Sequence, residues 1–412
     1  MTSICILVQS VYDFDPRVRR KAEALVAAGY SVDVLALRRS DGAASYTLNG
    51  VHVETIGLGK KRGSLARYMF EYAAFFAWAF VRLALLMRRR RYAVIDVNTL
   101  PDFLVFAPLL ARWMGAKIIL DMHEITPEFY MSKYGIAGTS PLVRFLTYLE
   151  RASVDFADHV IAINEPILDL LVSRGLRRSK STVVMNAVDE ARFDRASSRA
   201  VAVPGSASPS RFVMMYHGTL TRFYGLDLAV EAFGLAHEDM PGAELWILGS
   251  GPDLPLLKAL AKKHGVAAAV RFVGQVPAAD IPAWLHECDL GLLPIRRDAF
   301  LDFAFPNKLP EFIIFGKAVL ISRLKAIQHY FSDQALAFFE PNDTVDLARQ
   351  MVRVYRDGAL RDRLAARART EYAPIRWELM KRRYLDLVAG MIGSKTRAPE
   401  RSQPAETTVL AG

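Results

Sequence analysis

Cysteine is scarce in this chain: two of its 412 residues are cysteines, Cys5 and Cys288. Both lie in apolar runs far apart in the sequence, so we interpret them as buried thiols in a reducing compartment. We expect neither a disulfide nor a metal site. No signal peptide precedes the first apolar strand, which begins at Ser3. The sequence therefore predicts a cytoplasmic protein.

Glycine is absent from the first strand-to-helix loop, Gln9 to Arg17. The glycine-rich fingerprint that sets a dinucleotide against a helix start is therefore missing there. A nucleic-acid reader motif is also missing, and basic residues are not interleaved with aromatic ones. We accordingly expect no nucleic-acid partner.

Positive charge is in excess and unevenly spread. The net charge is +10, and residues 1–200 hold 27 basic and 20 acidic side chains. Clusters at Lys60–Arg62 and Arg88–Arg91 suit an anionic membrane surface or a phosphorylated acceptor.

The most apolar segment, Tyr68 to Met87, is long enough for a membrane span. It contains Glu71 and Arg82, and a strand from Ala93 to Val97 follows it, and both features argue against a span. We predict a long helix packed on a sheet. A second interpretation places its outer face in a membrane interface, with the arginines that follow at the headgroups.

Strands and helices alternate along most of the chain. The pattern begins with a strand from Ser3 to Val8, a helix from Asp15 to Gly29 and a strand from Ser31 to Leu37. We also expect one helix between Asp102 and Gly115. Such strand-helix-strand units predict an α/β fold with doubly wound parallel sheets.

A change of composition divides the chain. Residues 195–210 are rich in Ala, Ser, Val and Pro without periodicity, which predicts a linker between two domains. We expect Rossmann-like domains over residues 1–194 and 211–373, facing each other across a cleft. A C-terminal helix, 374–392, is expected to return to the first domain, and the polar tail, 393–412, to be disordered.

One stretch has the features of a ligand-binding helix. Pro306 and Asn307 suit a helix start, and Gly316 suits its end. Unpaired backbone N–H groups at a helix start favour phosphate, and Lys308 adds a full charge. Glu311 lies on the same face as Lys308 and can accept hydrogen bonds from ribose hydroxyls. The pattern indicates a nucleotide along this helix; the alternative is a surface helix with an ion pair.

Further candidates lie at predicted strand ends. Gly218, Gly249, Gly251 and Gly274 follow strands in the second half, where backbone passes close to a ligand. Each glycine alone is also compatible with turn chemistry. In the first half, His123 follows a strand and has carboxylates beside it, and we interpret it as functional.

These residues resemble the family 4 glycosyltransferases of the GT-B fold, from Ile4 to about Leu387. No single motif is decisive, but their order and spacing together are specific. The segments that carry the resemblance are Asp15–Val18, Leu120–Glu124, Asn186–Asp189, Gly218–Gly225, Gly249–Pro252 and Pro306–Val319.

The resemblance implies a retaining, metal-independent transfer from a nucleotide-sugar, with the acceptor on the side of the first domain and no further cofactor. The glutamate matching Glu311 binds the donor ribose, and the histidine matching His123 contacts the donor sugar. The helix start from Asn307 to Leu309 faces the diphosphate. The remaining predicted site residues are Arg222, Lys308, Gly218, Thr219, Gly249, Gly251 and Pro306.

Departures from the family pattern are concentrated at the phosphate site. Thr219 and Tyr224 stand where the family commonly has an arginine and a lysine, so we assign the phosphate charge to Arg222 and Lys308. Phe303 replaces the first of two paired glutamates. The departures resemble a branch that assembles bacterial surface polysaccharides on lipid-linked or saccharide acceptors, at the inner face of the plasma membrane.

Two other functions remain open from the sequence. A non-hydrolysing nucleotide-sugar 2-epimerase would use acid and base carboxylates, for which Asp102, Asp121 and Glu124 are the candidates. A non-catalytic nucleotide-sugar-binding protein would account for the missing basic pair.

Overall fold

The computed structural model describes residues 1–58, 65–190, 203 and 211–393. The predicted linker, apart from Val203, lies outside the described residues, and so do the tail from residue 394 onward and the basic cluster Lys60–Arg62.

Contacts divide the chain into two compact units. The first unit holds Met1–Val97, Leu104–Ile119 and the chain from Arg382 onward. The second unit holds Asn98–Phe103 and Leu120–Lys381. The domain boundaries expected from composition stay a prediction.

The first sheet has eight strands in the order β3-β4-β2-β1-β5-β6-β7-β8. The edge strand β3 is antiparallel to β4, whereas β1, β2 and β4 pair in parallel. This arrangement resembles a doubly wound sheet with one antiparallel strand added at its edge. The strands are β1 (Ser3–Val11), β2 (Ser31–Leu37), β3 (Ser45–Leu48), β4 (Val51–Ile56), β5 (Tyr92–Asn98), β6 (Lys117–Met122), β7 (His159–Ala162) and β8 (Ser181–Val183).

The second sheet has six strands in the order β11-β10-β9-β12-β13-β14. Every neighbouring pair is parallel. The strand order reverses between β9 and β12, and ligands of open α/β sheets bind at such a switch point. The strands are β9 (Phe212–His217), β10 (Ala243–Leu248), β11 (Val270–Gly274), β12 (Leu290–Leu293), β13 (Ala318–Ser322) and β14 (Ala337–Phe339).

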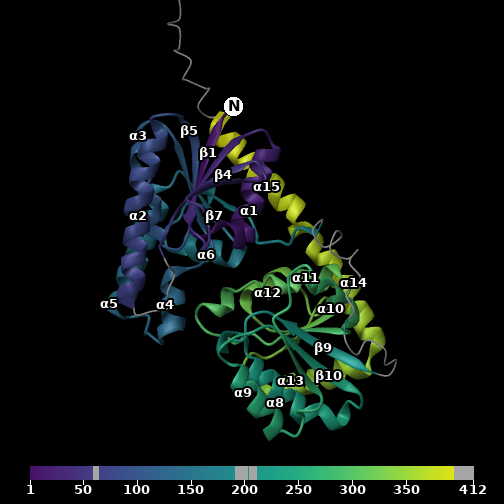
Figure 1. Ribbon diagram of the computed structural model, residues 1–412. Coiled ribbons are helices and arrows are strands. Elements are labelled where there is room, and N and C mark those ends of the chain that lie inside the picture. Colours follow the sequence, from purple (N-terminus) through teal and green to yellow (C-terminus); the bar gives the residue numbers. More distant parts are fainter. Residues whose placement is uncertain (59–64, 191–202, 204–210, 394–412) are drawn as a thin grey trace, which may run out of the picture. The chain divides into compact units, whose positions relative to one another are not determined.

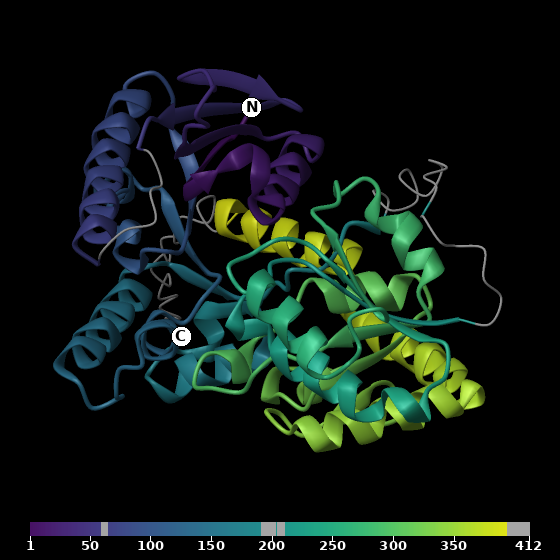
Figure 2. The same cartoon turned by 60° about the horizontal axis from the view of Figure 1, so that its bottom comes forward.

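Helices lie on both sides of the second sheet. In Figure 1, α8, α9 and α13 lie on the lower side and α11 and α12 on the upper side, and Figure 2 turns the lower side towards the viewer. The α-helices after residue 211 are α8 (Leu226–Ala236), α9 (Leu254–Lys263), α10 (Ile281–Glu287), α11 (Lys308–Ile314), α12 (Lys325–Tyr330), α13 (Thr344–Arg356), α14 (Gly358–Tyr372) and α15 (Trp377–Gly393). Those before it are α1 (Pro16–Ala27), α2 (Leu65–Met87), α3 (Leu109–Trp113), α4 (Thr126–Tyr134), α5 (Pro141–Phe156) and α6 (Glu165–Ser173).

The first strand-helix-strand unit follows the predicted pattern. The predicted strand from Ser31 to Leu37 is confirmed, and the first strand continues three residues beyond its predicted end, to Val11. Helix α1 begins at Pro16, and the Asp15 carboxylate caps it by accepting a hydrogen bond from the backbone N–H of Arg17. A proline at the first helical position sacrifices no helical hydrogen bond.

The single helix predicted between Asp102 and Gly115 is wrong. The structure has a short 3₁₀ helix, Asp102–Phe106, followed by α3, Leu109–Trp113. Pro108 stands between them as the residue that precedes α3. A proline inside a helix lacks an N–H donor and clashes with the preceding turn, which explains the break.

A buried polar cluster holds the part of α15 from Arg382 onward in the first unit. The hydroxyl of Tyr384 donates a 2.7 Å hydrogen bond to Oδ2 of Asp96, and Nζ of Lys21 lies 3.0 Å from the same oxygen. Asp96 is fully buried on β5, and Lys21 comes from α1. One carboxylate therefore ties a strand, a helix near the N-terminus and the last helix together.

Candidate functional site

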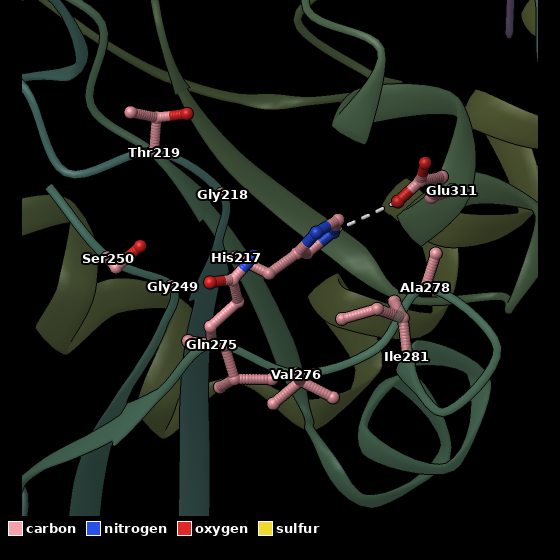
Figure 3. A pocket seen from close by; sticks show the side chains of 11 residues that line it. His217, Gly218, Thr219, Gly249, Ser250, Gln275, Val276, Ala278, Ile281 and Glu311 are labelled. Atoms are coloured by element: carbon pink, nitrogen blue, oxygen red, sulfur yellow. Dashed lines mark ion pairs between the residues drawn. The ribbon is translucent and has the colours of Figure 1, made fainter. Parts of the chain in front are cut away.

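Helix α11 is fixed against the second sheet by its inward side chains. Leu309, Phe312 and Ile313 are fully buried. A Cβ at Gly291 on β12 would lie 2.5 Å from Cγ of Phe312, so the ring occupies the space that the glycine leaves. This packing keeps the opposite side of the helix, which carries Glu311, directed towards the end of β9 (Figure 3).

Glu311 lies beside a buried histidine at the end of β9. Oε2 of Glu311 is 3.2 Å from Nε2 of His217 (Figure 3). Burial, and secondly the charge of Lys308, lowers the pKa of His217 to about 3. The imidazole is therefore neutral near pH 7, so its contact with Glu311 is not an ion pair between opposite charges.

Lys308 lies across the loop that follows β9. A Cβ at Gly218 would come within 2.2 Å of Cε of Lys308, so only glycine leaves room for this side chain. The Lys308 ammonium lies 5.5 Å from the ring centre of Tyr216 and 4.3 Å from that of Tyr224. Burial lowers the pKa of Lys308 to about 8, and the Glu311 charge opposes this shift. Lys308 is thus a cation at neutral pH, enclosed by aromatic faces.

The glycines after β9 and β10 let two loops approach each other. A Cβ at Gly249 would lie 1.8 Å from the carbonyl oxygen of Gly218, and one at Gly251 would lie 2.1 Å from that of Leu220. The N–H of Leu220 donates to the Ser250 carbonyl at 3.0 Å. Both glycines therefore serve a contact between backbones, and their contact with a ligand stays a prediction.

A pocket of about 360 Å³ opens at the carboxyl ends of β9, β10 and β11. Its wall combines hydroxyl, amide, imidazole and carboxylate groups with apolar side chains, so it suits a ligand with a flat apolar part and polar substituents (Figure 3). The lining residues are His217, Gly218, Thr219, Leu248, Gly249, Ser250, Gln275, Val276, Ala278, Ile281 and Glu311.

Four predicted site residues line this pocket: Gly218, Thr219, Gly249 and Glu311. Lys308 adjoins it through Gly218.

The other predicted residues of the second half lie outside the lining. Arg222 and Asn307 are exposed and Pro306 is half-buried. Leu309 is buried, and its N–H donates to the Pro306 carbonyl at 3.0 Å, so that donor is already occupied. Gly251 supports the loop contact described above.

His123 is held at the end of β6, within the second unit. Its Nε2 lies 2.9 Å from Oδ1 of Asn98 and 3.5 Å from Oδ2 of Asp121. Its backbone N–H donates to the Thr99 hydroxyl at 3.1 Å.

The residue after His123, Glu124, acts on Tyr224. Burial raises the pKa of Tyr224, and the charge of Glu124 raises it further. The loop after β6 therefore acts electrostatically on one of the rings around Lys308.

Asp102 belongs to a buried acidic cluster. It accepts a 2.8 Å hydrogen bond from the Thr126 hydroxyl, and burial followed by the Glu150 charge raises its pKa to about 7. Arg174 pairs with both Glu128 and Glu150. Asp102 is thus engaged by the Thr126 hydroxyl within the protein, and it does not belong to the lining of the pocket at the ends of β9, β10 and β11.

Several pocket residues were not predicted: His217, Leu248, Ser250, Gln275, Val276, Ala278 and Ile281. Gln275 directly follows Gly274 at the end of β11, so the rule that ligands bind at strand ends could have identified it. His217 is the last residue of β9, and the same rule applies to it.

Within the residues that the structure describes, no group of three or more His, Cys, Asp or Glu side chains could hold a metal ion.

Two parallel-sheet domains with a pocket at a switch point define a class of nucleotide-handling α/β proteins, and comparison with known proteins identifies the family. Residues 15–187 match the family described as glycosyl transferase 4-like domain, and residues 211–357 match glycosyl transferases group 1. The chain belongs to the group 1, or family 4, glycosyltransferases, and it is a glycosyltransferase.

Relatives and solved structures agree with this assignment. Glycogen synthase from Mycobacterium tuberculosis is 25% identical over 365 residues, which cover 85% of this chain and 84% of that protein. Sucrose-phosphate synthase from Thermosynechococcus elongatus has a TM-score of 0.76 at 16% identity, covering 96% of this chain and 100% of that one. Anabaena Alr3699/HepE in complex with UDP-glucose has a TM-score of 0.67 at 16% identity, and the match covers 95% of this chain and 100% of that one. The fold is GT-B.

Proposed function

We propose that this glycosyltransferase moves one sugar from a nucleotide-sugar donor to a lipid-linked or saccharide acceptor, with retention of anomeric configuration and without a metal ion. The observation that carries the proposal is the pocket at the carboxyl ends of β9, β10 and β11, beside the switch point, with Glu311 in its wall and Lys308 next to it. Related Anabaena HepE has been solved with UDP-glucose, which makes a uridine nucleotide the first donor to test.

Each part of a nucleotide has a matching group in or beside this pocket. The Glu311 carboxylate can accept hydrogen bonds from both ribose hydroxyls. Val276 and Ile281 offer apolar surface to a flat base. The Lys308 ammonium at Gly218 supplies positive charge for the diphosphate. Because breaking the glycosidic bond leaves negative charge on the diphosphate, a cation fixed there lowers the energy of the transition state.

Arg222 and His123 complete the proposed machinery. Arg222 is exposed, and no acidic partner for it is found among the described residues, so its guanidinium is available to a phosphate. We assign His123 to a hydroxyl of the donor sugar. Pro306, Asn307 and Leu309 act as the support that orients Lys308 and Glu311.

We place the reaction at the inner face of the plasma membrane, in the assembly of a surface polysaccharide. The substitutions at Thr219, Tyr224 and Phe303 support this branch of the family. The excess of positive charge before residue 200 supports an acceptor carried by anionic lipid.

A thermal-shift screen against UDP-, GDP-, ADP- and dTDP-sugars tests the donor site, because a ligand that binds only the folded state raises the melting temperature. One nucleotide is expected to stabilise the wild type and Glu378→Ala, a control at an exposed glutamate on α15, but not Glu311→Ala. If no nucleotide stabilises the wild type or Glu378→Ala, the proposed donor site is contradicted.

Product analysis separates the reaction classes. With an acceptor present and EDTA added, NMR of the product should show the anomeric configuration of the donor. Inversion, or dependence on added metal, contradicts the proposed chemistry. Conversion of the donor to its 2-epimer without any acceptor would assign the chain to the epimerases, and donor binding without turnover would assign it to the non-catalytic binders.

A further inference from the structure

Helix α2 is apolar on both sides, although only one side is covered. Its inward residues, Phe75, Ala79 and Leu83, are at most 1% exposed. A helix that is apolar all round is normally buried throughout. Yet only 28% of an 18-residue apolar window within Arg67–Met87 is buried. Among the described residues, the outward side therefore has no protein partner that would explain its composition.

The outward side forms a continuous apolar stripe with four-residue spacing. Met69, Ala73, Ala77, Val81 and Leu85 are all exposed, with Val81 at 56% and Leu85 at 44%. Residues four apart lie on one face of a helix. Among these five positions there is no charged or polar side chain, which is unusual for a face in contact with water.

Arginines gather where this stripe ends. A pocket of about 280 Å³ is lined by Arg82, Leu85, Leu86, Arg88 and Arg89. Arg82 pairs with Glu54, but Arg88 and Arg89 are exposed and have no carboxylate partner in the described part of the chain. Two uncommitted guanidinium groups beside the exposed Leu85 and the half-buried Leu86 suit a ligand with a phosphate and an adjoining hydrocarbon chain.

We propose that the outward side of α2 is a membrane-docking surface that lies in the plane of an anionic phospholipid bilayer, with a lipid phosphate in the arginine pocket. The stripe of Met69, Val81 and Leu85 enters the boundary between headgroups and acyl chains. The helix does not cross the bilayer, since its other side is packed on the first unit. This inference rests on the proposed function, because a lipid-linked acceptor is what gives the surface its use.

The neighbouring helix α3 supports this orientation. It contacts α2, and its C-terminal end exposes Trp113 at 74% and Met114 at 55%. Tryptophan is enriched at membrane interfaces, where its apolar ring and its N–H group both find partners. Both helices belong to the first unit, so the surface does not depend on the second one.

Flotation of the full chain with vesicles tests the proposal. We expect binding to vesicles that contain phosphatidylglycerol, weaker binding as salt is raised, and little binding to pure phosphatidylcholine. Arg88→Gln with Arg89→Gln should weaken partitioning by roughly fivefold for each arginine removed. Val81→Ser with Leu85→Ser should weaken it on both kinds of vesicle, because the inserted apolar area is lost.

Matched controls come from exposed residues on other helices. Arg363→Gln with Arg369→Gln removes the same charge from α14, and Leu256→Ser with Val345→Ser removes apolar groups that are 51% and 71% exposed. These variants should bind vesicles as the wild type does. Equal losses in the control and α2 variants, or no loss in the α2 variants, would overturn the proposal.

Two further measurements distinguish a membrane surface from a dimer interface, and a failure of this proposal from a failure of the proposed function. A concentration-dependent dimer that Val81→Ser with Leu85→Ser abolishes would show that a second copy covers the stripe, which overturns the membrane assignment. The α2 variants should keep the thermal shift produced by the donor nucleotide. Vesicle binding without any nucleotide shift would mean that the surface is right and the proposed function wrong.

Discussion

The side chain of Lys308 fills the space that a Cβ atom at Gly218 would need, with Cε 2.2 Å from that position. The two residues come from different elements, the start of α11 and the loop after β9. Their contact fixes a cation beside the pocket. The position of the positive charge that would attract the donor's phosphates therefore depends on a glycine at position 218.

Gly218→Ala is expected to displace Lys308 and to weaken nucleoside diphosphate binding by on the order of tenfold, the usual effect of losing a charge-assisted hydrogen bond. Gly218 also has φ +133°, which strains any other residue. The control is Gly265→Ala, at φ +73° with nothing within 4 Å of a Cβ, which adds backbone strain alone. Calorimetric titration measures the affinity of each variant for the nucleoside diphosphate. Equal affinities for the two variants would contradict the role of the contact.

Binding of a nucleoside diphosphate should weaken as the pH rises through about 8, the pKa of Lys308 in the free protein. Burial depresses this pKa, so the lysine loses its proton there, and the attraction to the diphosphate is lost with it. Well below that pH the ammonium is fully charged, and Lys308 adds no further pH dependence to the affinity. Lys308→Arg, which stays charged throughout, should remove the decline. The same decline in Lys308→Arg would show that another group titrates.

Asp96→Asn should destabilise the protein by about 3–5 kcal/mol, because it leaves the buried Lys21 ammonium without its counter-charge. The hydroxyl of Tyr384 still has an acceptor in this variant, the amide oxygen of the asparagine. The loss of stability therefore measures the ion pair between Lys21 and Asp96. Denaturant unfolding followed by circular dichroism measures the change. Asp41→Asn, which breaks the exposed pair with Arg39, should cause no measurable loss. Equal stability of Asp96→Asn and the wild type would contradict the role of the pair.

Asp102 should make the protein less stable as the pH rises. Burial raises its folded-state pKa from 3.8 to about 7, so the folded chain holds a proton that the unfolded chain releases between these values. The free energy of unfolding therefore falls as the pH rises from about 3.8 to about 7, and this contribution is constant above 7. Asp102→Asn keeps the acceptor for Thr126 and removes the charge. It should raise the melting temperature more at pH 8 than at pH 5, whereas Asp333→Asn, at an exposed residue, should not. The same gain from Asp102→Asn at both pH values would contradict the shift.

Much of the fold could be predicted because buried parallel strands are nearly continuous apolar runs. The strand from Ser31 to Leu37 is buried over six of its seven residues, and its bounds match the prediction. The edge strand β3, Ser45–Leu48, was not predicted, since it is short, polar and half-exposed. Helix α4 was also missed. The break at Pro108 could have been foreseen from proline chemistry alone.

The candidate site was only partly predictable for a physical reason. Glu311 and Lys308 follow from a local helix pattern. His217 lies next to Glu311 only because α11 and β9 are neighbours in the folded chain, a relationship that no local pattern contains. Likewise, Gly249 faces the carbonyl of Gly218, and the ring of Tyr224 faces Lys308, through tertiary packing.

The most direct test of the central claim compares the affinity of the preferred ribonucleoside diphosphate with that of its 2′,3′-dideoxy counterpart, in the wild type and in Glu311→Ala. If Glu311 binds the donor ribose, the wild type should prefer the ribonucleotide by roughly tenfold or more, and the preference should vanish in the variant. Glu378→Ala should retain it. An unchanged preference in Glu311→Ala would show that the ribose lies elsewhere, and the donor site assigned to this pocket would be wrong.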